Sequence, residues 1–271
     1  MKFSQWQKLW SRHAETPSFA RVVAEAKRIA AEGARKGHLY ASLSGGKDSC
    51  AMVGVMVEVG LGRFRCAHAA SALSLPGGEE AALAVCEKYD LPLDVEEPEA
   101  DAFGLLAALP LDQDAFEKRH MDALLRHVGS GNLMVNYAYR SHLNRAEFPL
   151  GGLTVAYVGL RADESRARAL SLRTHGPIYQ NKIDAMWRVC PLARWSVRDV
   201  WAFVTSREIP VHPYYARACD ELGMDPEQLR TDLIVAPEGV GARGALQPIR
   251  RLYPDLWRRL CASRPEAVRY G

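Results

Sequence analysis

The residues best suited to chemistry form one short hexamer, Ser44-Gly45-Gly46-Lys47-Asp48-Ser49. The apolar run at 39–43 before it predicts a short buried strand, and residues 50–57 after it, apolar on every side, predict a buried helix. A glycine-rich turn between a strand and a helix gathers backbone N–H groups and the positive end of the helix dipole at one point. The hexamer therefore predicts an anion site with phosphate as its natural ligand.

The side chains of the hexamer suggest further roles. Lys47 supplies a mobile point charge, and Ser49 either caps the helix or offers its hydroxyl to a phosphate oxygen. Asp48 needs a different explanation, because a carboxylate repels a phosphate beside it. We expect Asp48 to be a first-turn helix residue or a contact to a bridging Mg²⁺.

The spacing of the hexamer excludes two common phosphate loops. The Walker A loop is longer between its first glycine and its Gly-Lys-Ser/Thr, and the dinucleotide fingerprint needs spaced glycines, whereas Gly45 and Gly46 are adjacent. The hexamer resembles the PP-loop of the ATP pyrophosphatase superfamily, whose usual form is SGGxDS. This resemblance implies binding of ATP and cleavage between its α- and β-phosphates, or binding of a related adenylyl nucleotide.

A second motif, Gly159 to Arg168, follows a predicted strand at 154–158. The strand again runs through a glycine into a predicted helix, at the edge where a doubly wound sheet binds ligands. Arg161 and Arg168 together suit bidentate binding of one anion. Glu164 and Arg168 also have the spacing of an ordinary helix ion pair, so both interpretations of Arg168 remain open.

A third region, residues 190–215, joins a predicted helix to a loop fixed by prolines. Ser196 and Asp199 have the spacing of a capping box, which favours a cap over a catalytic acid for Asp199. Residues 209–215 predict a rigid loop. It contains His212, which either contacts a ligand or, as is commoner for a lone histidine between prolines, is structural.

Together these motifs resemble, over residues 38–215, the phosphoadenosine-phosphosulfate (PAPS) reductase family, which includes the small subunit of the bacterial ATP sulfurylase. The resemblance implies an adenine nucleotide alpha hydrolase-like, Rossmann-like α/β fold. It also implies an enzyme that uses ATP and Mg²⁺ to adenylylate an acceptor and releases pyrophosphate. The residues so implied are Ser44, Gly45, Gly46, Lys47, Asp48, Ser49, Gly159, Arg161 and Arg168 for the nucleotide, Lys47, Asp48 and Arg161 for catalysis, and Asp48 for Mg²⁺.

The chain departs from the true reductases near its C-terminal end. It lacks the ECGxH-like motif whose cysteine attacks the sulfonate sulfur, and it lacks the double cysteines of cluster-bearing adenylylsulfate reductases. Cys261, beside Leu260 in a helix that Pro254 opens, is expected to be a packed thiol. Two alternatives remain: a thiol-dependent phosphoadenylylsulfate reductase that uses Cys261, and a nucleotide-binding subunit that is active only with a partner.

The elements that must position these motifs alternate along the chain. Helical spacing fills residues 1–37, and predicted strands at 39–43, 64–70 and 91–95 alternate with helices. This rhythm is typical of a doubly wound, mainly parallel sheet with ligands at the strand C-termini.

We therefore expect an N-terminal helical extension (1–37), a nucleotide-binding α/β domain (38–215) and a C-terminal extension (216–271) that faces a substrate or partner. Four basic residues have no assigned role. For Arg140, His142 and Arg145 a solvated face is the simpler interpretation, and anion binding is the alternative. The fourth is Arg243, in the C-terminal extension.

Composition sets broad limits on function. Of the 271 residues, 48% are hydrophobic and 25% charged, and the net charge of +3 suits a small anion but does not indicate nucleic acid. No apolar run approaches the roughly 18 residues of a membrane span. The first residues lack a signal peptide's apolar core, so we expect a cytoplasmic protein without membrane contact. The 6 cysteines form no CxxC pair, so we expect no iron–sulfur cluster. A homodimer or a partner subunit remains open.

Overall fold

The computed structural model describes residues 1–62, 64–70, 75–96, 154–181, 186–231, 246–263 and 265–270. Several predicted features lie outside these ranges. They are a helix face that the spacing of Met121, Leu124, Leu125 and Val128 predicts, and the basic residues Arg140, His142, Arg145 and Arg243.

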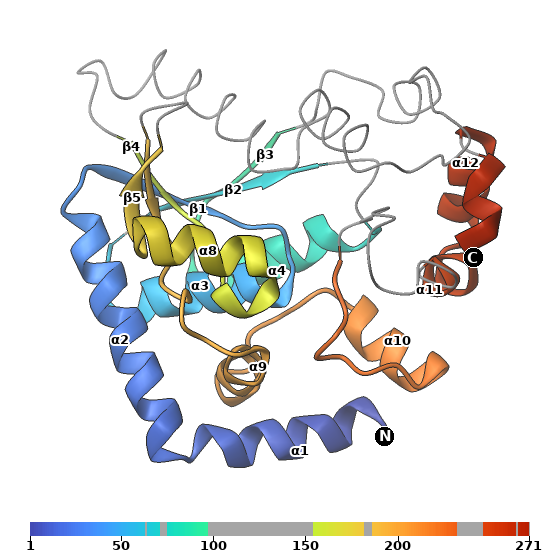
Figure 1. Cartoon of the computed structure of the whole chain (residues 1–271), viewed down its shortest axis with the longest axis horizontal. Coiled ribbons are helices and arrows are strands. Elements are labelled where there is room, and N and C mark those ends of the chain that lie inside the picture. The colour runs from blue at the N-terminus through green and yellow to red at the C-terminus, as the bar shows by residue number, and fades with distance from the viewer. Residues whose placement is uncertain are drawn as a thin grey trace.

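A six-stranded sheet with the order β3-β2-β1-β4-β6-β5 forms the centre of the protein (Figure 1). The strands are β1 (His38–Ser42), β2 (Arg65–Ala69), β3 (Leu93–Glu96), β4 (Thr154–Tyr157), β5 (Ile178–Gln180) and β6 (Trp187–Val189). Every neighbouring pair is parallel except β5 and β6. Strands β2 and β3 lie on one side of β1, and β4, β6 and β5 lie on the other. The predicted doubly wound, mainly parallel α/β fold is confirmed.

The helices agree with most of the sequence predictions. They are α1 (Phe3–Ala14), α2 (Pro17–Ala34), α3 (Lys47–Glu58), α4 (Gly78–Tyr89), α8 (Arg166–His175), α9 (Val197–Ser206), α10 (Tyr214–Leu222), α11 (Gln247–Leu252) and α12 (Pro254–Ser263), with 3-10 turns η2 (Ala162–Glu164) and η3 (Pro265–Tyr270). None of the helices in the described ranges is both long and apolar enough to cross a membrane.

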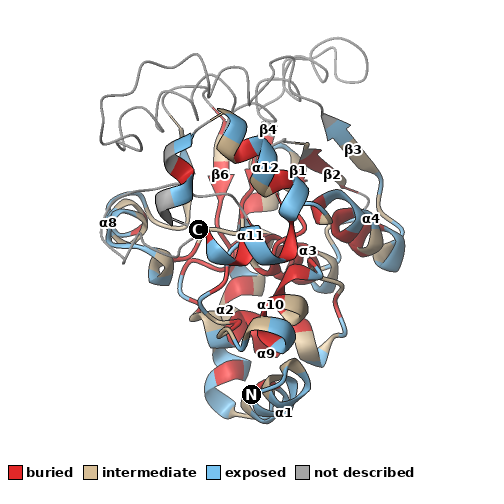
Figure 2. Cartoon of the chain, turned by 90° about the vertical axis from the view of Figure 1, so that its right-hand side faces the viewer, coloured by how far each residue is buried: buried red, intermediate tan, exposed pale blue. Residues whose placement is uncertain are grey.

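Helix α3 is the central helix, and it holds the loop in place. Its residues from Cys50 to Met56 are buried, as predicted from their apolar character. It packs against β1, α2 and α9, and Figure 2 shows this region as a continuous buried mass. At Gly54 a Cβ atom would lie 2.6 Å from Ile209 Cδ1 and 2.9 Å from Phe203 Cε1. A side chain there would therefore push α9 away from α3.

Helices α1, α9 and α10 meet in an aromatic cluster of Phe3, Trp10, Trp201 and Tyr215. The rings of Trp10 and Trp201 stack at 4.5 Å, and Phe3 packs edge-on against both. Tyr215 meets Trp201 edge-on at 4.9 Å. Such pairs add to the burial of large apolar rings. The cluster ties the N-terminal helix to the part of α10 that contacts the loop.

Two local predictions need correction. The segment 209–215 is not a loop throughout, because α10 begins at Tyr214, directly after Pro213. Strands β5 and β6 were not predicted. Each has only 3 residues. Arg188 at the centre of β6 is polar yet buried, so the segment lacks the apolar run that signals a strand.

Candidate functional site

The hexamer 44–49 lies between the carboxyl end of β1 and the start of α3. On one side of β1 lies β2 and on the other β4, so the chain leaves this point in opposite directions. Ligands of doubly wound sheets bind at such a switch point. Gly159, just after β4, packs directly against the start of α3, since a Cβ atom on it would lie only 2.8 Å from the Asp48 carbonyl carbon. Both predicted glycine motifs therefore meet at the carboxyl edge of the sheet.

The backbone of the loop is tightly fixed. Gly45 has φ +76°, and a Cβ there would lie 2.3 Å from the Gly78 carbonyl oxygen, so only glycine fits. The Ser49 hydroxyl donates to the Gly46 carbonyl at 3.0 Å and accepts the Ser44 N–H at 3.2 Å. Gly46 is the N-cap of α3 and has no side-chain cap. The predicted helix cap by Ser49 is therefore wrong, because the Ser49 hydroxyl instead bonds the backbone of Ser44 and Gly46 within the turn.

Lys47 is buried and already partnered, which corrects its prediction as a mobile charge. Its side chain is 4% exposed, and Nζ lies 3.1 Å from Asp48 Oδ2. Nζ also donates to the Leu229 carbonyl at 3.2 Å and lies 5.5 Å from the centre of the Tyr215 ring. The Lys47 backbone N–H donates to the Tyr215 hydroxyl at 3.2 Å. Both the ammonium and the first-turn amide are thus held at the start of α3.

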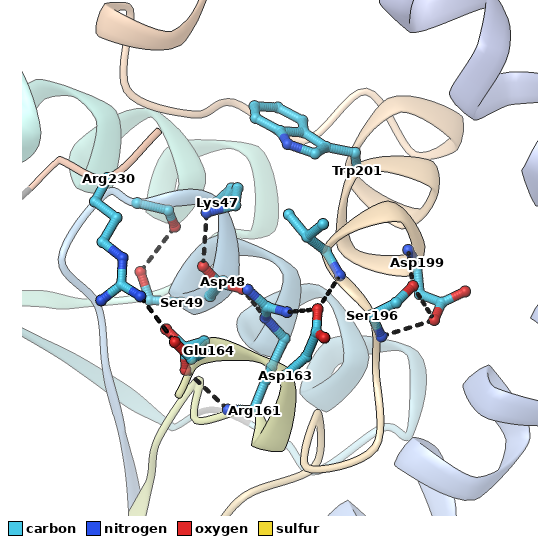
Figure 3. A network of polar contacts seen from close by, with 12 residues as sticks. Lys47, Asp48, Ser49, Arg161, Asp163, Glu164, Ser196, Asp199, Trp201 and Arg230 are labelled. Carbon is cyan, nitrogen blue, oxygen red and sulfur yellow. Dashed lines mark hydrogen bonds and ion pairs between the residues drawn. The ribbon is translucent and has the colours of Figure 1, made fainter. Parts of the chain in front are cut away.

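Asp48 occupies the first turn of α3, as predicted, and binds Arg161 from the β4 side (Figure 3). Arg161 Nε donates to Asp48 Oδ1, and its Nη1 lies 3.3 Å from Asp163 Oδ2. Burial raises the pKa of Asp48, but the charges of Lys47 and Arg161 outweigh burial and hold that pKa below its ordinary value. Asp48 is therefore an ionised carboxylate between two cations.

This arrangement does not fit a divalent cation at Asp48. Both carboxylate oxygens face positive groups, Lys47 on one side and Arg161 on the other. Within the described ranges no group of three or more His, Cys, Asp or Glu side chains could hold a metal ion.

Arg168 lies on α8 and forms an ion pair with Glu164, four residues before it. Glu164 also accepts the Arg161 N–H at 3.0 Å. The structure therefore brings Arg161 to the loop and directs the Arg168 guanidinium to Glu164, which is the ordinary helix pairing that the spacing left open.

The segment 229–231 is a part of the site that sequence motifs did not reveal. The Leu229 carbonyl accepts the Lys47 ammonium, and Arg230 Nη2 donates to the Glu164 carbonyl at 3.0 Å. Thr231 Oγ1 lies 3.1 Å from the point where a Cβ on Gly46 would stand. For Arg230 the sequence predicts only a place in the C-terminal extension (216–271), which is expected to face a substrate or partner. No local pattern marks these residues, because the fold alone brings them to the loop.

A family model of the phosphoadenosine phosphosulfate reductase domain matches residues 38–228, well over half of the chain. The chain belongs to this family. The match begins where the predicted nucleotide-binding domain begins and continues beyond residue 215, the end that we predict for it.

Individual relatives of this PAPS reductase-family protein match over shorter stretches. Sulfate adenylyltransferase subunit 2 of Rhizobium meliloti is 26% identical over 150 residues, 42% of this chain and 50% of the relative. Phosphoadenosine 5'-phosphosulfate reductase of Xanthomonas oryzae pv. oryzae is 31% identical over 67 residues, 25% of either chain. The chain thus covers between a quarter and a half of the length of these relatives.

Solved structures with similar shape are more distant in sequence. The PAPS reductase of Candida auris has a TM-score of 0.45 and 15% identity, over 83% of this chain and 94% of that one. FMN adenylyltransferase of Candida glabrata has a TM-score of 0.48 and 13% identity, over 78% of this chain and 66% of the other.

Other candidate residues of this PAPS reductase-family chain have structural partners. His212 Nδ1 accepts the Tyr214 N–H, and Nε2 donates to the Leu75 carbonyl at 3.1 Å, which supports the structural interpretation of His212. Asp199 completes the predicted capping box with Ser196.

Neither Cys50 nor Cys261 shows a sign of activation. Cys50 and Cys86 are buried, and burial raises the pKa of Cys50 well above its ordinary value. Cys261 lies in α12, half-buried against the core, and desolvation raises its pKa as well. A raised pKa keeps the thiol protonated and a poor nucleophile. This environment favours the packed role that we predicted for Cys261.

Proposed function

We propose that this protein binds an adenine nucleotide with its phosphates on the loop 44–49, and cleaves ATP between the α- and β-phosphates to adenylylate an acceptor. The observation that carries the proposal is the geometry of the loop. Gly45, with its positive φ, and Gly46 form the tight turn that leads into the N-terminus of α3, at the switch point of the sheet. Backbone amides and the helix dipole at such a point favour a phosphate. Membership of the PAPS reductase family supports an adenine nucleotide as the ligand.

In the proposed reaction an acceptor atom bonds to the α-phosphorus, and the bond from that phosphorus to the bridging oxygen breaks. The electron pair leaves with pyrophosphate, where negative charge accumulates. Preorganised donors that face this charge lower the barrier. The Lys47 ammonium and the first-turn amides of α3 that follow Lys47, whose own N–H is bonded to Tyr215, are the donors nearest to the loop. Lys47 exchanges its bond to the Leu229 carbonyl for one to a phosphate oxygen, while Asp48 and Arg161 keep the turn in place.

The first test is Lys47→Ala. Removal of a charged donor is expected to weaken ATP binding about 10- to 150-fold, from a loss of roughly 1.5–3 kcal/mol, without unfolding the protein. Titration calorimetry measures the affinity, and a melting curve checks the fold. Lys88→Ala is the matched control, because Lys88 is exposed at the end of α4. Unchanged ATP affinity in Lys47→Ala with an intact melting curve would remove Lys47 from the site.

A further inference from the structure

The charges around the loop are unequally compensated. Lys47 pairs with Asp48, Arg161 pairs with Asp48 and Asp163, and Arg168 pairs with Glu164. The positive charges of these side chains are therefore largely compensated by carboxylates of the protein itself. A guanidinium that is paired with a carboxylate attracts an incoming anion less strongly than an unpaired guanidinium does.

Arg230 differs from these cations. It is exposed, and its guanidinium donates to a backbone carbonyl, that of Glu164. Among the described residues it has no carboxylate partner. Figure 3 shows the Arg230 side chain extending to Glu164, whose carbonyl it contacts. Its full charge is therefore available beside the loop.

Thr231 provides an independent observation. It is only 7% exposed, and its hydroxyl lies against Gly46 of the loop. Among the described residues this hydroxyl makes no hydrogen bond, although the residue itself is largely buried. A ligand oxygen on the loop would satisfy it.

The backbone on either side of Arg230 is fixed to the site. The Leu229 carbonyl accepts the Lys47 ammonium, and the Thr231 carbonyl accepts the Leu75 N–H at 3.2 Å. The segment 229–231 thus lies between the loop and Leu75, and the Arg230 side chain reaches from it to Glu164 in η2. Its fixed backbone holds both side chains in position before any ligand arrives.

We infer that Leu229, Arg230 and Thr231 form an outer wall of the anion site, in which the Arg230 guanidinium and the Thr231 hydroxyl bind the phosphate groups that rest on the loop. The ligand class is a pyrophosphate group, free or as part of a nucleotide. The wall begins at residue 229, directly after the family match ends at 228. This inference rests on the proposed function, because it needs a phosphate on the loop.

The test uses the full chain and inorganic pyrophosphate, titrated by calorimetry. Arg230→Ala is expected to bind pyrophosphate about 10-fold more weakly, and Thr231→Val about 3-fold more weakly. Arg230→Lys keeps a charge without the planar fork and should fall between wild type and Arg230→Ala. Thr231→Ser keeps the hydroxyl and should bind like wild type. Arg28→Ala is the control for net charge, since Arg28 is exposed on α2 and pairs with Glu32.

The outcomes separate this inference from the proposed function. If Lys47→Ala weakens pyrophosphate binding while Arg230→Ala and Thr231→Val bind like wild type, the wall is wrong and the loop site stands. If Thr231→Ser loses as much affinity as Thr231→Val, the hydroxyl is not the contact and the role of Thr231 is overturned. If the wild-type protein binds neither pyrophosphate nor ATP, both proposals fail together.

Discussion

Two regions of different chemistry meet at Lys47. On one side the aromatic cluster of Phe3, Trp10, Trp201 and Tyr215 reaches the Lys47 amide through the Tyr215 hydroxyl. On the other side a charged cluster, which we define as Lys47, Asp48, Arg161 and Asp163, joins the start of α3 to the end of β4.

The two regions are held together by different forces. The aromatic rings are stabilised by removal of apolar area from water and need no partner charge. The buried charges are costly to desolvate and depend on one another, so the loss of one leaves the others uncompensated. The aromatic cluster should therefore determine stability without changing the ligand site, whereas the charged cluster should affect both.

The largest expected effect is in the aromatic cluster. Trp10 is 1% exposed and stacks on Trp201. Trp10→Ala should lower the free energy of unfolding by about 3–5 kcal/mol, because it opens a large cavity. ATP affinity, measured at a temperature where the variant is still folded, should match that of wild type. A large loss of ATP affinity in the folded variant would show that the cluster shapes the site directly.

The charged cluster should respond differently to Asp48→Asn. This change leaves Lys47 and Arg161 without their shared carboxylate, and should cost about 3 kcal/mol of unfolding free energy at pH 7, the lower end of the usual cost of breaking a buried ion pair. ATP affinity should change as well, since the loop loses its brace. Urea denaturation and calorimetry measure the two effects.

The same substitution has an expected pH dependence. Because the folded-state pKa of Asp48 is depressed, its stabilisation is present above the ordinary carboxyl pKa and is lost as the pH falls through the folded value. The stability gap between wild type and Asp48→Asn should therefore shrink as the pH falls below about 4. A gap that stays constant into acid would contradict the ion-pair account.

The smallest expected effect comes from Tyr215, which links the regions. Tyr215→Phe keeps the ring in the cluster and removes the hydroxyl that accepts the Lys47 N–H. The unfolding free energy should fall by about 1 kcal/mol, the usual worth of one hydrogen bond. ATP affinity should change by no more than a few-fold. A loss as large as that of Lys47→Ala would mean that Tyr215 itself contacts the ligand.

Much of the fold followed from local patterns in the sequence. The apolar runs predicted β1, β2 and α3, and glycine spacing predicted the turns at Gly45 and Gly159, because these signals depend on near neighbours. The capping box of Ser196 and Asp199 is a similar local signal. The short strands β5 and β6 escaped prediction because three residues around a buried arginine carry no periodicity.

The details of the site were less predictable, for a physical reason. The partners of Asp48 include Arg161, more than a hundred residues later, and the partner of the Lys47 ammonium is a carbonyl at Leu229. Backbone carbonyls have no sequence signature, and a carboxylate in the first turn of a helix can pair with any cation that the fold supplies. Only the three-dimensional arrangement shows that Arg161 is neutralised while Arg230 is not.

The most direct test of the central claim is which phosphate bond of ATP breaks. Wild-type protein, in cell extract that supplies the acceptor, is given ATP labelled at the α- or the γ-phosphate, with Lys47→Ala in parallel to identify the products that depend on this loop. The account predicts that the γ label appears in pyrophosphate and the α label in AMP or an adenylate, both Lys47-dependent, because the acceptor attacks the α-phosphorus. Lys47-dependent formation of ADP and orthophosphate would contradict it.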